Sequence, residues 1–310
     1  MTALKILFAG TPAVAVPSLD ALVLAGFEVR SVLTREDAPV GRKRVLTASP
    51  VAVRAAELGL ATIKANKFDD VLVQRLAGLD VDAAAIVAYG ARVPAEALSI
   101  PAHGWVNLHF SLLPAWRGAA PVQYSVLHGD DVTGASTFRL EPGLDTGPVF
   151  GTVTETVRPA DTSGDLLERL ARSGSLLLAQ TLAGLAAGTI AAVPQRGEVT
   201  LAPKLSIDDA RIDWRQPALG VQRRVNAMTP EPGAWTSLGG QRVKLGPVAA
   251  EHEVNDQLAP GAVLVRGREV LVGTGGGVVV LGLVQPNGKK MMDARDWARG
   301  ASERGELVFV

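Results

Sequence analysis

The sequence predicts an α/β protein, with an open, mostly parallel sheet that has helices on both faces, followed by a small C-terminal β-barrel of the OB type. Over residues 1–188, short apolar runs alternate with helical patterns, which is typical of βαβ units. Residues 189–206 contain prolines and a glycine and are expected to form a linker. Residues 207–310 carry short β-like runs between glycines, as in small antiparallel barrels.

Composition excludes several kinds of chemistry. The chain has 310 residues, enough for two domains, and its 47% hydrophobic and 20% charged content fits a folded protein. It has no cysteine, which excludes disulfides, thiolate catalysis and cysteine metal sites. Its four histidines show no metal-binding spacing, so no metal is expected.

The sequence also indicates where the protein acts. The apolar run before Gly10-Thr11-Pro12 has only four residues, fewer than the roughly 7–15 of a signal peptide. No apolar stretch reaches the roughly 18 residues of a membrane span, so a cytoplasmic protein without a membrane partner is expected. Lys plus Arg and Asp plus Glu both number 31, which argues against an overall basic surface but allows a local basic patch.

The elements of the first region follow from apolar periodicity. The expected strands cover 4–9, 27–33, 82–88, 105–109, 134–140 and 149–157. The expected helices cover 13–25, 67–79, 117–127 and 164–187, and another begins at Ser49-Pro50, a cap followed by a first-turn proline. Neither G-x-G-x-x-G nor a P-loop motif occurs, so a nucleotide-binding site of those kinds is not supported.

Residues 34–48 interrupt this pattern and carry the basic run Arg42, Lys43 and Arg44. Composition alone favours a solvated surface loop. The alternative is a flexible basic loop that binds phosphate groups.

The segment 105–121 organises the rest of the chain. Asn107 and His109 are two residues apart in a predicted strand, so their side chains share one face. Pro114 ends the regular ladder, and a polar pair at a strand end before a loop and helix is where open α/β sheets bind ligands. The alternative is an ordinary edge strand with a structural histidine.

A second segment, Leu140–Pro148, has two glycines and two prolines around Asp145 and therefore holds this carboxylate in a tightly turned backbone. A carboxylate beside His109 would orient the ring and raise its pKa above the usual value of about 6.5. Asn, His and Asp together can act on a carbonyl group as donor, proton carrier and orienting charge.

The C-terminal region has one helical pattern over 220–227. Its β-like runs cover 241–245, 261–266, 269–273 and 278–283. Lys289-Lys290 is its densest basic position, and a lone pair of lysines is usually only solvated.

These motifs resemble those of the 10-formyltetrahydrofolate-dependent formyltransferases. The matching segments are Asn107-x-His109, Ser111–Pro114, Trp116–Pro121 and Gly143–Gly147. The resemblance implies the formyltransferase fold and a catalytic set in which Asn107 stabilises the oxyanion, His109 moves protons and Asp145 orients His109. It also implies a folate pocket formed by Val87, Tyr89, Gly90, Ser111, Leu112, Leu113 and Pro114, although core packing is an equal alternative for Tyr89.

The C-terminal motifs Ala202–Leu205, Ala210–Trp214, Pro232–Trp235 and Gln285–Met291 resemble those of the tRNA-directed members of this family. The resemblance therefore implies transfer of a formyl group from 10-formyltetrahydrofolate to the α-amine of methionyl initiator tRNA, in translation initiation, by a monomer. The implied tRNA-binding residues are Arg42, Lys43, Arg44, Lys204, Lys289 and Lys290.

Three other functions share parts of this pattern. A formyltransferase for a nucleotide-linked aminosugar would keep the N-terminal chemistry and use another acceptor. A 10-formyltetrahydrofolate hydrolase would use water in place of the amine. A catalytically silent RNA-binding protein would have no physical need for the complete Asn, His and Asp set.

Overall fold

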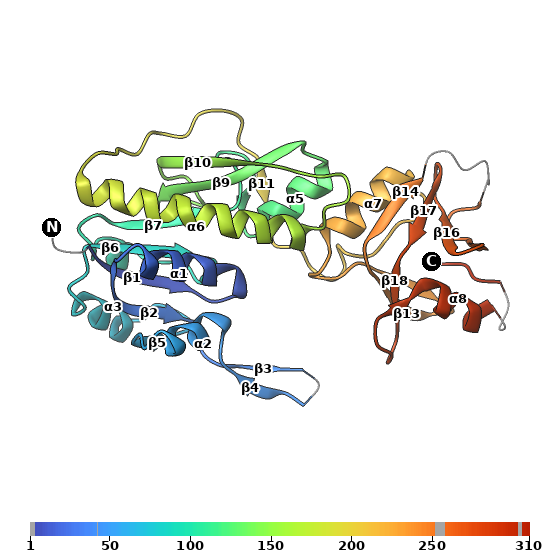
Figure 1. Ribbon diagram of the computed structural model, residues 1–310, viewed down its shortest axis with the longest axis horizontal. Coiled ribbons are helices and arrows are strands. Elements are labelled where there is room, and N and C mark those ends of the chain that lie inside the picture. The colour runs from blue at the N-terminus through green and yellow to red at the C-terminus, as the bar shows by residue number, and fades with distance from the viewer. Residues whose placement is uncertain (1–3, 42, 252–257, 303–305) are drawn as a thin grey trace. The chain divides into compact units, whose positions relative to one another are not determined.

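The computed structural model describes residues 4–41, 43–251, 258–302 and 306–310 (Figure 1). The chain forms two compact units, and neither is one continuous stretch of sequence. The first unit contains the chain up to Gly118, then Gly134–Glu155 and Leu167–Leu201, and the second contains Ala119–Thr133, Thr156–Leu166 and the chain from Ala202 onward. Within the described ranges, no helix combines the length and apolarity that a membrane crossing requires.

A seven-stranded sheet forms the centre of the first unit, in the order β10-β9-β7-β6-β1-β2-β5. These strands are β1 Lys5–Gly10, β2 Glu28–Thr34, β5 Thr62–Lys64, β6 Ala83–Val87, β7 Trp105–His109, β9 Val132–Arg139 and β10 Val149–Thr156. The five strands from β5 to β7 pair in parallel, and β9 pairs antiparallel with β7. The strand order reverses at β1, between β2 and β6, and open α/β sheets bind ligands beyond the carboxyl ends of strands at such a point.

Helices cover both faces of this sheet. The helical segments are η1 Ala13–Ala15, α1 Val16–Leu24, α2 Pro50–Glu57, α3 Asp70–Ala77, α4 Ala95–Leu98 and α6 Ser163–Ala187. On one face, Leu7 and Trp105 belong to a buried cluster that includes Leu76 of α3. On the other face α6 packs closely, since a Cβ added to its Gly174 would lie 3.0 Å from a methyl group of Leu108. The predicted α/β architecture is therefore confirmed.

Two helix starts show how local sequence sets the element boundaries. Ser49 Oγ accepts a hydrogen bond from Ala52 N at 3.0 Å, and Pro50 occupies the first turn of α2, as predicted. At the start of α6, Thr162 Oγ1 accepts from Asp165 N at 3.1 Å, while the Asp165 carboxylate accepts from Thr162 N at 3.0 Å. This reciprocal pair is a capping box in which aspartate replaces the usual glutamate.

The segment 34–48 is not the simple loop that was expected. It contains two short antiparallel strands, β3 Ala38–Val40 and β4 Val45–Thr47, which form a hairpin (Figure 1). All six strand residues are exposed, so the hairpin has no buried face to produce an alternating apolar pattern.

The second unit contains two antiparallel four-stranded sheets around one hydrophobic core. Their strands are β12 Trp235–Leu238, β13 Gln241–Leu245, β18 Leu283–Pro286 and β19 Met292–Asp293 in one sheet, and β14 Val248–Glu251, β17 Val278–Leu281, β16 Glu269–Gly273 and β15 Val263–Arg266 in the other. Helices α5 Pro121–His128, α7 Ala218–Ala227 and α8 Ala294–Ser302 also belong to this unit. The C-terminal segment joins the sheets, because Phe309 bridges to Leu238 and Val308 bridges to Ala262. The predicted antiparallel character of the C-terminal region is confirmed.

The segment 189–206 runs beside the elements that carry the candidate site. Val193 exchanges main-chain hydrogen bonds with Val149 of β10, each 2.8 Å long. Further along, β11 Leu201–Ala202 pairs with β8 Arg117–Gly118. Segment 189–206 therefore contacts residues that precede the Asp145 loop in sequence and residues that follow it. The domain limits predicted at 188 and 206 stay predictions.

Candidate active site

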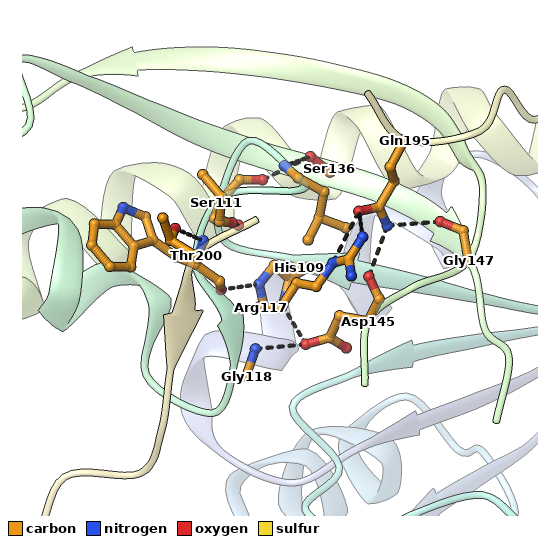
Figure 2. Close-up of polar contacts among 12 residues, drawn as sticks. His109, Ser111, Arg117, Gly118, Ser136, Asp145, Gly147, Gln195 and Thr200 are labelled. Carbon is orange, nitrogen blue, oxygen red and sulfur yellow. Dashed lines mark hydrogen bonds and ion pairs between the residues drawn. The ribbon is translucent and has the colours of Figure 1, made fainter. Parts of the chain in front are cut away.

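His109 lies at the carboxyl end of β7 and is almost completely buried, with 7% of its side chain exposed. Its Nε2 donates a hydrogen bond to the Trp116 carbonyl oxygen at 2.9 Å, and its Nδ1 lies 3.8 Å from Asp145 Oδ2 (Figure 2). Trp116 is in the left-handed region with φ of 57°, which an L-residue rarely adopts. The loop after β7 therefore turns back so that its main chain fixes the His109 ring.

Asp145 lies between β9 and β10 in the tightly turned segment that the sequence predicted. Its φ is 50°, again left-handed, a conformation that aspartate tolerates better than most residues. Its Oδ2 accepts a hydrogen bond from Gly118 N at 2.8 Å, and only 13% of its side chain is exposed. The structure thus brings together Asp145 and His109, which are far apart in sequence.

The pKa of His109 differs from the sequence-based expectation. Burial lowers this pKa below its usual value of 6.5, while the Asp145 carboxylate and the Trp116 carbonyl raise it by smaller amounts. The predicted rise in the His109 pKa is therefore wrong. The prediction took account of the neighbouring Asp145 charge but not of the loss of solvent around the ring. A neutral imidazole with Nε2–H bonded to Trp116 leaves Nδ1 able to accept a proton.

Asn107 lies two residues before His109 on β7 and is partly buried. Because side chains alternate along a strand, the two residues lie on the same face. Within the described part of the chain, the Asn107 side chain has no hydrogen-bond partner. Its amide is therefore available to donate to a substrate oxygen.

The Ser111–Pro114 loop is fixed largely by internal hydrogen bonds. Ser111 Oγ donates to the Ala115 carbonyl at 2.5 Å, and Ser136 Oγ donates to the Ser111 carbonyl at 2.7 Å. Leu113 N donates to Ser136 Oγ at 3.1 Å. The Ser111 hydroxyl, the Ser111 carbonyl and the Leu113 N–H are thus bonded within the protein, and Leu112 is the partly exposed residue of the Ser111–Pro114 loop.

Hydrogen bonds link the loops that follow β1, β2 and β6, at the point where the strand order of the sheet reverses. Thr11 Oγ1 donates to the Tyr89 carbonyl at 2.8 Å, and Arg35 Nη1 donates to the Gly90 carbonyl at 2.6 Å. The Tyr89 side chain is buried, and its hydroxyl donates to the Ala65 carbonyl at 2.7 Å. Burial raises the Tyr89 pKa to about 12, so this side chain is a neutral part of the core. Val87 is also fully buried.

The basic residues predicted to contact tRNA lie on both units. Lys43 and Arg44 are exposed at the turn of the β3–β4 hairpin, and Arg42 lies outside the described residues. Lys204, Lys289 and Lys290 are exposed on the second unit. No group of three His, Asp or Glu side chains suited to a metal ion occurs in the ranges that the structure describes.

Sequence reasoning missed two residues that contact the site. Gln195 donates to the carbonyls of Asp145 and Gly147, and Thr200 Oγ1 accepts from Trp116 N at 2.8 Å (Figure 2). Both lie in the predicted linker, where prolines and a glycine mask any periodic pattern. No local signal in the sequence identifies them.

The fold and site together define an α/β group-transfer enzyme that acts on a carbonyl group at the carboxyl edge of its sheet. The chain matches the Formyl transferase family over residues 4–182 and the Formyl transferase C-terminal domain over residues 204–302. It belongs to the formyl transferase family. The resemblance drawn from its motifs is thereby confirmed.

Known relatives cover the whole chain. The methionyl-tRNA formyltransferase of Arthrobacter sp. strain FB24 is 65% identical over 306 residues, covering 99% of this chain and 100% of that protein. The structure is also similar to that of methionyl-tRNA formyltransferase from Clostridium thermocellum, with a TM-score of 0.59 at 14% identity over 81% of this chain and 95% of that one. HypX from Aquifex aeolicus in complex with tetrahydrofolic acid gives a TM-score of 0.69 at 19% identity, over 97% of this chain and 47% of that one. At these identities the two structures support the fold alone.

Proposed function

We propose that this chain transfers the formyl group of 10-formyltetrahydrofolate to the α-amino group of methionyl initiator tRNA, for the initiation of translation. The observation that carries the proposal is the buried His109, with Asp145 3.8 Å from its Nδ1, in a chain that matches the formyl transferase family over both of its domains. The name of the 65% identical relative supplies the acceptor.

The proposed chemistry assigns one task to each side chain. Attack of a neutral amine on a formyl carbonyl places negative charge on the carbonyl oxygen, and the free Asn107 amide donates a hydrogen bond to it. The amine loses a proton, which His109 accepts at Nδ1. Both N–H groups of the resulting imidazolium then face acceptors, the Trp116 carbonyl and the Asp145 carboxylate. Asp145 therefore stabilises the protonated ring and fixes its orientation. The tetrahedral intermediate then collapses: the bond between the formyl carbon and N10 breaks, and the imidazolium returns its proton to N10, so that tetrahydrofolate leaves and His109 is neutral again.

The folate co-substrate is proposed to bind at the reversal point of the sheet. The folate-bound structural neighbour and the fold shared with it support a tetrahydrofolate donor. The main chain of Val87, Tyr89 and Gly90 and the loop of Ser111, Leu112, Leu113 and Pro114 would line this pocket. The Tyr89 and Ser111 hydroxyls are already bonded within the protein, so a polar contribution of either residue would come from its main chain, where a carbonyl oxygen can accept a second hydrogen bond.

The tRNA is proposed to contact both units. Lys43 and Arg44 on the hairpin, with Arg42, would bind phosphates near the aminoacyl end, and Lys204, Lys289 and Lys290 would bind phosphates from the second unit. We also propose that the protein acts as a monomer in the cytoplasm.

A formylation assay with several acceptors tests the proposal. Purified protein and 10-formyltetrahydrofolate are combined separately with methionylated initiator tRNA, elongator methionyl-tRNA, glycinamide ribonucleotide and an aminosugar nucleotide. Selective formylation of the initiator species is expected. Formylation of a small amine, or release of formate without an acceptor, would contradict the proposed substrate.

A further inference from the structure

Gln195 occupies the centre of a hydrogen-bond network behind Asp145 (Figure 2). Its Nε2 donates to the Asp145 carbonyl at 2.7 Å and to the Gly147 carbonyl at 2.8 Å. Its Oε1 accepts from Arg117 Nε at 3.1 Å and from Arg117 Nη2 at 2.6 Å. All four hydrogen-bonding positions of the amide are therefore used.

These bonds act on the backbone that determines where the Asp145 carboxylate points. Asp145 is held with φ of 50°, in the left-handed region that L-residues rarely adopt, and such a conformation persists where surrounding contacts enforce it. Gln195 supplies two such contacts, one at Asp145 itself and one two residues later. Arg117 in turn fixes which end of the Gln195 amide faces the loop, because its guanidinium can only donate.

The same segment holds the other partner of His109. Thr200 Oγ1 accepts from Trp116 N at 2.8 Å, and the Thr200 carbonyl accepts from Arg117 N at 2.9 Å. The Trp116 carbonyl is the group to which His109 Nε2 donates. Both acceptors that face the His109 ring are thus held by the chain between Gln195 and Thr200.

We propose that Gln195 is a positioning residue for formyl transfer, which holds the Asp145 carboxylate against His109 by fixing the backbone of the Asp145 loop. The inference rests on the proposed roles of His109 and Asp145. None of the four hydrogen bonds of Gln195 involves the side chain of Asn107, His109 or Asp145. Its effect is therefore expected in the rate of the chemical step rather than in substrate affinity.

Two substitutions separate the loop contact from the arginine contact. Gln195→Met keeps the length of the side chain and removes all four hydrogen bonds. Gln195→Glu keeps acceptors for Arg117 but presents a carboxylate oxygen to the carbonyls of Asp145 and Gly147, which then have no donor. Both variants should lower kcat about 10- to 100-fold, the scale expected for a small misplacement of catalytic groups, with little change in KM for either substrate.

Gln222 provides a matched control. It is also partly buried, and its amide donates to the Pro159 carbonyl at 2.7 Å and accepts from Ala250 N at 2.6 Å, within the second unit. Gln222→Met therefore removes comparable main-chain contacts without touching the Asp145 loop. Its kcat should equal that of the wild type. A kcat loss in Gln222→Met equal to that in Gln195→Met would show a general effect of loosened structure and would overturn the proposal.

A double-mutant cycle decides whether Gln195 acts through Asp145. Single-turnover formylation is measured for wild type, Gln195→Met, Asp145→Asn and the double variant. If Gln195 positions the Asp145 charge, adding Gln195→Met to Asp145→Asn should cause little further loss. Fully additive losses would overturn the proposal, as would a wild-type kcat in the folded Gln195→Glu protein. Normal turnover of Asp145→Asn alone would instead contradict the role proposed for the Asp145 carboxylate, on which the inference rests.

Discussion

The His109 ring faces two acceptors that suit its protonated form, although burial lowers its pKa. The two acceptors around the ring, the Trp116 carbonyl and the Asp145 carboxylate, match the two N–H groups of an imidazolium. Burial nevertheless lowers the pKa of the ring, because the charged form loses its solvation. A residue of this kind can accept a proton during the reaction and return it afterwards.

This lowered pKa gives stability a defined pH dependence. The unfolded chain has a histidine pKa of about 6.5, so below this pH it binds a proton that the folded protein binds less readily. The His109 contribution to stability is therefore complete above about pH 6.5 and is lost as the pH falls toward the lower pKa of the folded state. We expect His109→Gln to lose less stability than wild type between neutral and mildly acidic pH, measured by urea unfolding. If the difference in unfolding free energy between wild type and His109→Gln stayed constant with pH, this prediction would be wrong.

Asn107 is expected to contribute to the transition state alone. Its side chain has no partner within the described part of the chain, so Asn107→Ala breaks no internal hydrogen bond. Loss of one oxyanion donor typically lowers the rate about 10²- to 10³-fold, and we expect a decrease of that size in single-turnover formylation. Folate binding, measured by titration, should be unchanged. Near-normal turnover would remove Asn107 from the mechanism.

The sequence allowed some of these residues to be predicted and not others. Asn107 and His109 could be chosen because a strand places residues two apart on one face, and Asp145 because glycines and prolines surround it. Gln195 could not be chosen, because its partners lie 50 and 78 positions away at Asp145 and Arg117. The direction of the His109 pKa shift could not be predicted from the sequence either, because it depends on how completely the folded chain excludes water from the ring.

At the scale of elements, burial made some strands predictable, although short strands such as β5 and β14 were missed despite a buried residue in each. The strand β16 was predicted with its observed limits, Glu269–Gly273, and four of its five residues are buried. The hairpin strands β3 and β4 were missed because every one of their residues is exposed. Apolar periodicity reports burial, and an element without a buried face produces no such pattern.

The C-terminal segment is an element whose packing can be tested directly. The Phe309 ring is 2% exposed and stacks between Trp214 and Trp297, with centroid distances of 5.5 Å to each. Phe309→Ala should destabilise the second unit by about 3–5 kcal/mol, because it removes buried apolar surface and leaves a cavity. Val308, which is 40% exposed, supplies the control, and Val308→Ala should have a small effect. Thermal unfolding of the full chain measures both, and equal effects would contradict the packing argument.

At the scale of the molecule, the two units are interleaved in sequence. Residues 119–133 and 156–166 group with the C-terminal unit, although both lie inside the region that periodicity assigns to the first domain. Contact between distant segments decides which compact unit each segment joins, so a unit need not be one continuous stretch of sequence. The site residues from Asn107 to Gln195, by contrast, all belong to the first unit.

A protein of balanced net charge that binds a polyanionic acceptor needs local groups of basic residues, and the candidate residues lie on both units. If Lys43 and Arg44 bind phosphates, replacing both with Ala should weaken tRNA binding and reduce the slope of log affinity against log salt by about one for each phosphate that is no longer bound. Lys289→Ala with Lys290→Ala should do the same from the second unit. Because the two pairs would bind different phosphates, their effects on log affinity should add in the combined variant.

Folate binding and the rate with saturating tRNA should remain close to wild type in these variants, since neither pair contacts the His109 site. Lys5 provides the control, because its ammonium group lies 2.6 Å from Asp80 Oδ2 and its charge is already paired. Lys5→Ala should leave the salt slope unchanged. If the hairpin pair changes the slope and the Lys289-Lys290 pair does not, the tRNA contacts of the second unit must lie elsewhere on its surface. If neither pair changes it, both sets of residues are ordinary solvated surface charges.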